Sequence, residues 1–370
     1  MTVGFDAAAL ANRATAALRA YDPGHDLPAL RRRFGATIAE LGSNENPLGP
    51  SPLAMQAATR VLQDMWRYPD PTGTALKACL STELGIAPAG ITLGNGSHEL
   101  LMLLAQCFAD AEHPVVFSQY GFAVFPIAAA AAGAQGIAVP ALPADHPEAP
   151  YGHDLDAITH AVTPATRLVY LANPNNPTGT WFTAAALAAF LGRVPPSTLV
   201  VVDEAYHEYV DAAGPDTAVT LMDRFPNLVV TRTFSKAHGL AGLRIGYMAS
   251  HPSVAAVCER LRESFNVNAV ALAAAEAALA DRAHRDRVRE VNAGDRAWLA
   301  DALTARGMRV LPSQANFLLV DLGRDAAPVE AHLFERGVIV RPMGGYRLPH
   351  TVRISIGSRA ELHRLLENLP

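Results

Sequence analysis

The sequence reads Leu199-Val-Val-Val-Asp203-Glu-Ala-Tyr206 a little past the middle of the chain. A short apolar run of this kind is typical of a strand that is buried on both faces, as in a parallel sheet. Asp203 ends the run, and the carboxyl ends of strands are where open α/β sheets bind ligands. Because a carboxylate in apolar surroundings is costly unless it is paired, Asp203 needs a partner, and a protonated pyridine nitrogen is a suitable one.

Similar short β-rich runs occur on both sides of this segment and alternate with helical patterns. The expected strands are 91–93, 115–118, 137–139, 167–172, 198–203, 227–232 and 244–248. Helices expected between them include 97–109, 184–191 and 254–263, which are long enough for right-handed crossovers. This alternation predicts an α/β fold with a mostly parallel seven-stranded sheet flanked by helices.

The last hundred residues have a different pattern. A long Ala- and Arg-rich helical region, 269–306, is followed by short strands and helices, which predict a smaller α+β domain. The residues before Pro50 are rich in turn formers. We expect an N-terminal arm and linker over 1–50, part of which joins the small domain, a large domain over 51–265 and a small C-terminal domain over 266–370.

The composition excludes several classes of function. A chain of 370 residues that is 50% hydrophobic can bury the cores of two domains, and a net charge of −5 without a basic run disfavours nucleic acid as a partner. No apolar run is long enough to cross a membrane, and the first residues, which include Asp6, lack the pattern of a secretory signal. Cys79, Cys107 and Cys258 are too far apart to suggest a disulfide framework. We expect a cytoplasmic protein.

A second chemically suggestive segment is Thr231-Arg-Thr-Phe-Ser-Lys-Ala-His-Gly-Leu-Ala-Gly-Leu-Arg244. It follows an apolar strand and places Thr233, Ser235, Lys236 and Arg244 in a glycine-containing loop. A neutral lysine amine forms Schiff bases with carbonyl groups, and arginine offers a planar fork to phosphate oxygens. The combination indicates a site for a phosphate-bearing molecule with an electrophilic carbonyl, although a solvated loop would also explain the segment taken alone.

Two turns at the ends of expected strands support the same interpretation. Asn173-Pro-Asn-Asn-Pro-Thr-Gly179 can aim Asn176 back over the sheet edge. Leu93-Gly-Asn-Gly-Ser-His-Glu99 combines a strand, a small-residue turn and a helix start, whose free N–H groups favour an anion. Capping of that helix by Ser97 or Asn95 is the alternative explanation.

Other classes of protein fit the sequence less well. Gly94 and Gly96 lack the third glycine of a dinucleotide-binding fingerprint. Thr233-x-x-Lys236 is similar to the nucleophile pattern of penicillin-interacting enzymes, but its serine and its accompanying motifs are missing. A non-catalytic binding protein would have no need of Lys236.

A metal-dependent hydrolase is a further alternative. Asp203, Glu204, His207 and Glu208 form an acidic and histidine cluster in which Asp203 and His207 have the i, i+4 spacing. No HExxH motif accompanies this cluster, and we predict no metal site.

Several motifs occur together in a family-specific order and spacing. They are Asn173-Pro-Asn-Asn-Pro-Thr-Gly179, Val202-Asp-Glu-Ala-Tyr206, Thr233-Phe-Ser-Lys236 and Gly242-Leu-Arg-Ile-Gly246. Over nearly the whole chain they resemble the fold-type I pyridoxal 5'-phosphate (PLP) aminotransferases of class I/II. A second set is Asn44-Glu-Asn-Pro-Leu-Gly-Pro-Ser51, Arg67-Tyr-Pro-Asp70, Asn316-Phe-Leu-Leu319, Val338-Ile-Val-Arg341 and Val352-Arg-Ile-Ser-Ile-Gly357. This set resembles the histidinol-phosphate aminotransferase family.

The resemblance implies a role for each residue around the cofactor ring. Lys236 holds PLP as a Schiff base and, once released by substrate, moves the proton between the substrate Cα and C4' of the cofactor. Asp203 keeps the pyridine nitrogen protonated, which makes the ring an electron sink. Asn176 and Tyr206 hydrogen-bond the phenolic oxygen, and Tyr120 stacks on the ring.

The cofactor phosphate is assigned by the same resemblance to a helix end and a cation. The groups are the backbone N–H of Ser97 and His98, the hydroxyls of Thr233 and Ser235, and the guanidinium of Arg244. His98 stands where an aspartate is often found in the family, a change that the backbone contact should tolerate.

The resemblance also implies a homodimer with shared active sites, because Tyr68 matches a tyrosine that reaches the phosphate from the neighbouring subunit. For the substrate, Arg353 matches the arginine that grips the carboxylate, and Arg341 with it takes the substrate phosphate. Asn176 lies beside the substrate, and Tyr21 of the N-terminal arm contacts the phosphate across the dimer. Solvated arginines on an edge strand are the alternative for Arg341 and Arg353.

The implied reaction is a transamination in histidine biosynthesis. Histidinol phosphate would give its amino group to 2-oxoglutarate, which yields imidazole acetol phosphate and glutamate. An aromatic amino-acid or prephenate aminotransferase is the alternative, because relatives with an ending like Gly344-Gly-Tyr-Arg-Leu-Pro349 often handle aromatic side chains. A PLP-dependent decarboxylase is a less favoured one. All of these share the cofactor site.

Overall fold

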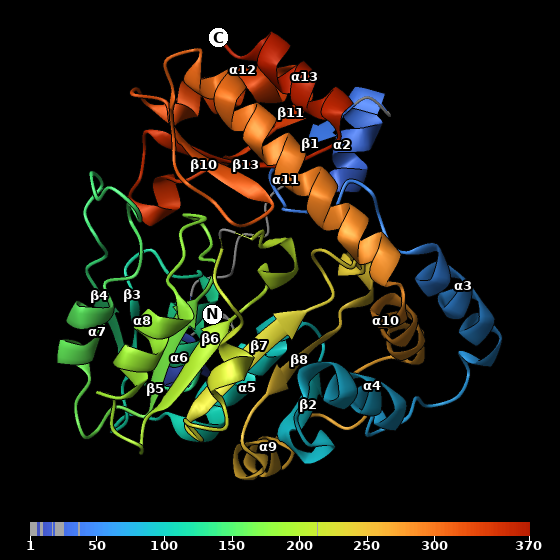
Figure 1. Ribbon diagram of the computed structural model, residues 1–370, viewed down its shortest axis with the longest axis vertical. Helices are drawn as coiled ribbons and strands as arrows, with labels where there is room; N and C mark the ends of the chain where they lie inside the picture. Colours follow the sequence, from blue (N-terminus) through green and yellow to red (C-terminus); the bar gives the residue numbers. More distant parts are fainter. Residues whose placement is uncertain (1–5, 8–9, 17, 19–25, 36–37, 213) are drawn as a thin grey trace, which may run out of the picture.

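A seven-stranded sheet forms the centre of the larger unit (Figure 1), as seen in a computed structural model that describes residues 6–7, 10–16, 18, 26–35, 38–212 and 214–370. The strands are β2 (Ile91–Gly94), β3 (Val115–Ser118), β4 (Gly136–Val139), β5 (Leu168–Ala172), β6 (Leu199–Asp203), β7 (Leu228–Thr233) and β8 (Gly246–Ala249). Their order is β2-β8-β7-β6-β5-β3-β4. Only the two pairings of β8, with β2 and with β7, are antiparallel, which confirms the mostly parallel α/β sheet.

The central strands are apolar on both faces because helices cover both sides of the sheet. Val201 of β6 packs into the cluster that contains residues of α5 (Ser97–Phe108) and α6 (Val124–Ala131). Val200 and Val202 face the opposite cluster, with residues of α7 (Leu155–Ala161) and α8 (Ala184–Leu191). Continuous burial of this kind explains why the strand sequence does not alternate between apolar and polar residues.

The remaining helices differ from expectation at two places. Helix α9 (Pro252–Cys258) ends before residue 263, because the N–H groups of Arg260 and Leu261 bond only three residues back. The region 269–306 is two helices, α10 (Ala269–Ala280) and α11 (Arg282–Thr304). They are separated at Asp281, whose carboxylate accepts the N–H of His284 as an N-cap and the hydroxyl of Ser51.

The smaller unit is built on a four-stranded antiparallel sheet with the order β12-β13-β10-β9. These strands are β9 (Arg309–Val310), β10 (Phe317–Asp321), β12 (Arg341–Pro342) and β13 (Thr351–Ser355). Helices α11, α12 (Ala326–Glu335) and α13 (Arg359–Asn368) contribute to the apolar cluster on this sheet. Near the start of the chain, β1 (Ala39–Glu40) pairs in parallel with β11 (Val338–Ile339), so this part of the N-terminal segment lies with the smaller unit.

The domain boundaries expected at residues 50 and 265 remain predictions. The contacts of α10, the helix that follows residue 265, are relevant to the second boundary. Helix α10 packs against α3 (Pro52–Val61) and α4 (Thr74–Leu84) in a cluster that also contains Ile91 and Leu93 of β2.

Two short helices precede α3 in the chain, α1 (Arg13–Ala16) and α2 (Leu27–Phe34). In the part of the chain that the structure describes, no helix is both long enough and apolar enough to cross a membrane.

Candidate active site

An inner cavity of about 220 Å³ lies at the edge of the sheet where the parallel strands end. Asp203 reaches it from the end of β6, Thr233 from the end of β7 and Asn176 from the turn after β5. The start of α5 and the loop between β7 and β8 close it. Its lining therefore gathers most of the predicted site residues: Ser97, His98, Asn176, Asp203, Tyr206, Thr233, Ser235, Lys236, Arg244, Arg341 and Arg353.

The amine of Lys236 faces this cavity. Its Nζ donates to the carbonyl oxygen of Ser43 at 3.1 Å and lies 5.9 Å from the ring centre of Tyr206. Burial, which disfavours the charged amine, and the positive Arg353 lower the pKa of Lys236 to about 8. About a tenth of such an amine is neutral at pH 7, which suits a nucleophile toward carbonyl groups.

Asp203 is the buried acid of the site, with 4% of its surface exposed. The hydroxyl of Thr231 on the neighbouring strand donates to its Oδ1 at 2.8 Å. Burial nevertheless raises the pKa of Asp203 to about 7. A cation placed in the cavity would stabilise the ionised carboxylate and lower that pKa, which is the behaviour expected of a partner for a protonated ring nitrogen.

A buried ion pair lies directly behind Asp203. Arg232 of β7 donates from Nε and Nη2 to one oxygen of Glu204, at 3.0 and 2.8 Å. The other Glu204 oxygen accepts the N–H of Ala218 at 2.6 Å. Burial alone would raise the pKa of Glu204, but Arg232 and the nearby His207 hold it below its ordinary value. The second carboxylate next to Asp203 is thus neutralised inside the core.

The start of α5 has the features of an anion site. Its N-cap is Gly96, with φ 87° and no side-chain cap, so the first N–H groups of the helix have no capping side chain. Arg244 lies over this turn, since a Cβ built on Gly96 would come within 2.7 Å of its guanidinium. The Nη1 of Arg244 also lies 3.4 Å from the Ser235 hydroxyl. Burial and Arg244 lower the pKa of His98, which favours its neutral form here.

Asn176 and Arg353 separate the inner cavity from a larger outer one. Arg353 donates from Nη1 to the side-chain oxygen of Asn176 at 2.7 Å and from Nη2 to the carbonyl of Gly42 at 2.6 Å. Both residues, with Phe122 and Arg341, line the two cavities. Arg353 is therefore fixed at the junction of the two cavities. It is 9% exposed, which contradicts the alternative of a solvated edge-strand side chain for this residue.

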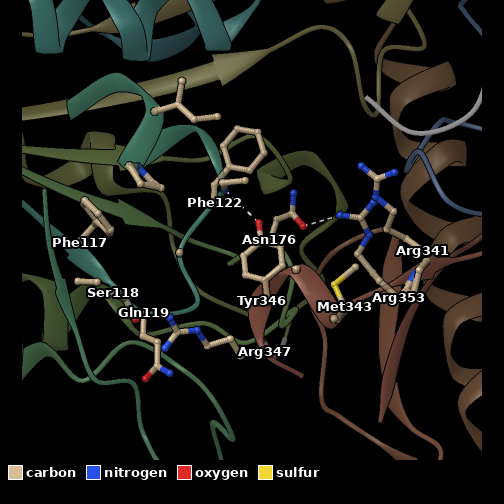
Figure 2. Close-up of a pocket in the computed structure, with 18 of the residues that line it drawn as sticks. Phe117, Ser118, Gln119, Phe122, Asn176, Arg341, Met343, Tyr346, Arg347 and Arg353 are labelled. Atoms are coloured by element: carbon tan, nitrogen blue, oxygen red, sulfur yellow. Dashed lines mark hydrogen bonds between the residues drawn. The ribbon is translucent and has the colours of Figure 1, made fainter. Parts of the chain in front are cut away.

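The outer cavity has a volume of about 1080 Å³ and opens beyond this junction. Figure 2 shows its labelled lining, with Phe117, Ser118 and Gln119 on the left, Phe122 and Tyr346 in the middle, and Met343, Arg341 and Arg353 on the right. Phe117 and Ser118 end β3, and Gln119 and Phe122 lie between β3 and α6. Met343, Tyr346 and Arg347 belong to the segment between β12 and β13. A large chamber next to a small chemical site is the arrangement expected of an enzyme that binds sizeable substrates.

Two of the predicted residues that the structure describes, Tyr120 and Tyr68, do not line the inner cavity of this chain. The ring of Tyr120 packs edge-on against Tyr151, with ring centres 5.3 Å apart, and its carbonyl accepts the side-chain N–H of Asn175. Tyr68 is 83% exposed and stacks on Phe265 at 4.7 Å. Tyr21 lies outside the described residues.

Sequence reasoning missed several residues that the structure places at the inner cavity. Phe122, two positions after Tyr120, lines it in place of Tyr120, and the turn closed by the Gly121 N–H on the Ser118 carbonyl separates the two rings. Ser43 and Asn44 also line it, and Asn44 donates to the Tyr206 hydroxyl at 3.0 Å. The segment that begins at Asn44 carries part of the family resemblance, which is a signal that could have found them.

The alternative of a metal centre at Asp203 to Glu208 has no support in the geometry. Asp203 faces the cavity, whereas Glu204 is bonded to Arg232 inside the core. Among the residues that the structure describes, no group of three or more histidine, cysteine or acidic side chains has the arrangement of a metal site.

Fold and site together define an aminotransferase of the fold-type I class, with a lysine, an acid and an anion-binding helix start around one cavity. The family model for aminotransferases of class I and II matches residues 36–369. The chain belongs to this family and, within it, to the histidinol-phosphate aminotransferases.

The similarity extends over nearly the whole length of individual relatives and of a solved structure. The chain is 50% identical to histidinol-phosphate aminotransferase 1 of Nitrosococcus oceani, covering 95% of this chain and 94% of the relative. It is 46% identical to histidinol-phosphate aminotransferase 2 of Pseudomonas aeruginosa, covering 98% of both chains. The crystal structure of histidinol-phosphate aminotransferase from Sinorhizobium meliloti in complex with pyridoxal-5'-phosphate is similar with a TM-score of 0.88, at 34% identity over 100% of this chain and 98% of that one.

Breaking the buried ion pair behind Asp203 should destabilise the protein. Arg232→Met leaves Glu204 charged and unpaired in the core, a loss of about 3–5 kcal/mol. For a chain of this length that corresponds to a drop of roughly 5 °C in the melting temperature, measured by calorimetry.

A matched control is Arg193→Met, which removes an ion pair to Asp156 whose side chains are 44% and 75% exposed. Its melting temperature should stay within about 1 °C of wild type, because exposed pairs contribute little. Equal effects of the two substitutions would contradict the role assigned to Arg232.

Proposed function

We propose that this protein is a PLP-dependent histidinol-phosphate aminotransferase. It transfers the amino group of histidinol phosphate to 2-oxoglutarate and yields imidazole acetol phosphate and glutamate, a step of histidine biosynthesis. The observation that carries the proposal is the convergence of Lys236, Asp203 and Arg244 on one small cavity, with Arg353 at its mouth. The names of the relatives at 44–50% identity support the choice of substrate.

The residues present fit PLP at three separate points. A phosphate suits the uncapped start of α5 beside Arg244, where a Cβ on Gly96 would meet the guanidinium. A ring nitrogen that carries a proton suits Asp203, and an aldehyde carbon suits the partly neutral amine of Lys236. Phe122, rather than Tyr120, is the aromatic side chain that we assign to the face of the ring.

Bound PLP supplies an electron sink for the charge left on the substrate when its Cα loses a proton. Asp203 holds the proton on the ring nitrogen, and the Thr231 hydroxyl keeps its carboxylate oriented. The amine of Lys236, once free, takes the proton from Cα and returns it to C4' of the cofactor. One base serves both positions.

Two further side chains are set to donate to the phenolic oxygen of the cofactor. The Tyr206 hydroxyl accepts from Asn44, which leaves its own proton available to donate. The Asn176 oxygen accepts from Arg353, so its amide nitrogen is available in the same way. Arg353 and Arg341, which line both cavities, bind the anionic group of the substrate.

We also propose that the protein works as a cytoplasmic homodimer. Nine of its exposed large hydrophobic side chains fall in two short stretches of the chain. They are Leu48, Leu53, Met55, Leu62, Met65, Trp66, Tyr68, Leu261 and Phe265. Such a concentration of exposed apolar side chains is typical of a subunit interface, and it includes Tyr68, which the family resemblance assigns to the partner's site. The free cysteines fit a reducing compartment.

The rate at which Lys236 reacts with PLP should rise with pH and level off above about pH 8, where its amine becomes neutral. Below that value the neutral fraction, and therefore the rate, falls about tenfold per pH unit. The rate is measured by mixing apoenzyme with PLP and following the visible absorption of the lysine-bound cofactor.

Variants test the cause of this profile. Lys236→Ala should develop no such absorption at any pH. Arg353→Leu removes a positive charge that lowers the pKa of Lys236, so the plateau should move to higher pH. Arg324→Gln, whose arginine bonds the Pro370 carbonyl and lines neither cavity, should match wild type. A wild-type rate that still rises steeply near pH 10 would show that the lysine is not buried in this way.

Histidinol phosphate should be the preferred amine donor. With 2-oxoglutarate as acceptor, we expect its kcat/KM to exceed those of phenylalanine and tyrosine by about a hundredfold or more, because its phosphate meets Arg341 and Arg353 with charge-assisted hydrogen bonds. Glutamate formation is measured for each donor. A preference for phenylalanine would support the aromatic aminotransferase instead.

The assembled protein should have twice the 39.2 kDa mass of the chain in sedimentation equilibrium. Trp66→Asp, at a side chain that is 71% exposed here, should shift it toward the monomer, because the new carboxylate would be buried in the interface. Ala327→Asp introduces the same group at an exposed position of α12 and should leave the mass unchanged. A wild type that is monomeric at micromolar concentration would rule out the shared site.

A further inference from the structure

A series of buried hydrogen bonds runs from the smaller unit to the hydroxyl of Tyr206. It begins at Ser355, the last residue of β13, passes through the side chain of Asn44 and ends at Tyr206. These three residues are 2%, 1% and 4% exposed, in that order. Ser355 lines neither cavity, so any effect that it has on the inner cavity must pass through Asn44.

The hydroxyl of Ser355 has a fixed role at each of its two contacts with Asn44. It accepts the backbone N–H of Asn44 at 2.8 Å and donates its own proton to Oδ1 of the same residue at 2.9 Å. Because a backbone N–H can only donate, the hydroxyl must accept there, and its proton is left for the oxygen. Asn44 makes both contacts with φ 56°, a left-handed conformation that asparagine adopts more readily than most residues.

These contacts decide which end of the Asn44 amide faces Tyr206. With the amide oxygen at Ser355, the NH₂ group lies at Tyr206 and donates to its hydroxyl at 3.0 Å. If the amide were reversed, the Ser355 hydroxyl would face two N–H groups of Asn44, and its own proton would lose its acceptor inside the core. A buried polar group without a partner is costly, so Ser355 favours the observed orientation.

The orientation of the amide in turn directs the proton of Tyr206. Because this hydroxyl accepts from Asn44, its own proton points away from Asn44, and Tyr206 lines the inner cavity. A reversed amide would place an oxygen at Tyr206 and attract that proton to itself. Ser355 therefore influences whether Tyr206 is a donor toward the inner cavity.

The strand that carries Ser355 also carries Arg353, which lies two residues earlier and therefore on the same face. Arg353 donates to the carbonyl of Gly42 at 2.6 Å. The carbonyl of Asn44 accepts from the side chain of Asn316, next to β10, at 3.0 Å. The smaller unit thus holds the segment around Asn44 from several sides, which keeps its amide in place.

We propose that Ser355 is a positioning residue for the proposed reaction, which fixes the amide of Asn44 and so directs the proton of Tyr206 to the phenolic oxygen of bound PLP. This inference rests on the proposed function, because it requires that oxygen to lie beside Tyr206. A hydrogen bond donated to the phenolic oxygen stabilises negative charge there. The lysine-bound cofactor then holds less tightly the proton that it shares between its nitrogen and this oxygen.

The pH midpoint at which the visible absorption of the lysine-bound cofactor changes measures how tightly that proton is held. Tyr206→Phe should raise the midpoint by about one pH unit or more, because a hydrogen bond to a charged group is lost. Ser355→Ala should raise it by about half a pH unit or more, since the Asn44 amide can then turn its oxygen toward Tyr206. Both variants keep the other titratable groups that line the inner cavity, which are His98, Asp203, Lys236, Arg244, Arg341 and Arg353.

A double variant shows whether Ser355 acts through Tyr206. Tyr206→Phe combined with Ser355→Ala should have the midpoint of Tyr206→Phe alone, because without the hydroxyl there is no proton to direct. Ser250→Ala is the matched control. Ser250 is 3% exposed, its hydroxyl donates to the His251 carbonyl at 3.2 Å and it lines neither cavity, so this variant should keep the wild-type midpoint.

The outcomes separate this inference from the proposed function. An unchanged midpoint in Ser355→Ala, or shifts from Ser355→Ala and Tyr206→Phe that add in the double variant, would overturn the positioning role while PLP binding and amino transfer by wild type stand. A wild type whose variants shift as expected, but which transfers no amino group from histidinol phosphate to 2-oxoglutarate, would count against the proposed function alone.

Discussion

The burial of Asp203 at the end of β6 is the constraint on which the site depends. Its carboxylate has almost no contact with water, and a second carboxylate, Glu204, follows it directly. Arg232 neutralises that neighbour within the core, whereas Asp203 at the sheet edge still requires a cation. A protonated ring nitrogen meets it, and the benefit is reciprocal, because the carboxylate stabilises the proton on the ring as much as the ring stabilises the carboxylate.

Lys236 presents the opposite problem in the same cavity. Burial and the positive Arg353 disfavour its charged form, just as burial disfavours the charged form of Asp203. Burial therefore shifts both groups toward their neutral forms. A ligand with a cationic ring nitrogen at one point and a phosphate near Arg244 at another balances these charges, while the carbonyl carbon meets an amine that is ready to react.

Much of this arrangement could be predicted from the sequence because it lies in short, contiguous motifs. Asp203, Lys236 and Arg244 each follow or precede an apolar strand, and a parallel sheet brings such ends to one edge. Tyr120 and Phe122 could not be told apart in this way, because a turn of a few residues decides which ring faces the cavity. Likewise, the N-cap residue Asp281 that divides the helical region 269–306 also accepts a hydrogen bond from Ser51, far away in the sequence, and the sequence pattern does not reveal this contact.

The separation of the two cavities explains how chemistry and specificity can vary independently in this fold. The inner cavity is built from strand ends and a helix start, where a change would disturb the packed core. The outer cavity is bounded by the segment between β12 and β13, in which Met343 and Leu348 are buried and hold both ends in place. Residues 344–347 between them are largely exposed, so their side chains can change with little effect on the core.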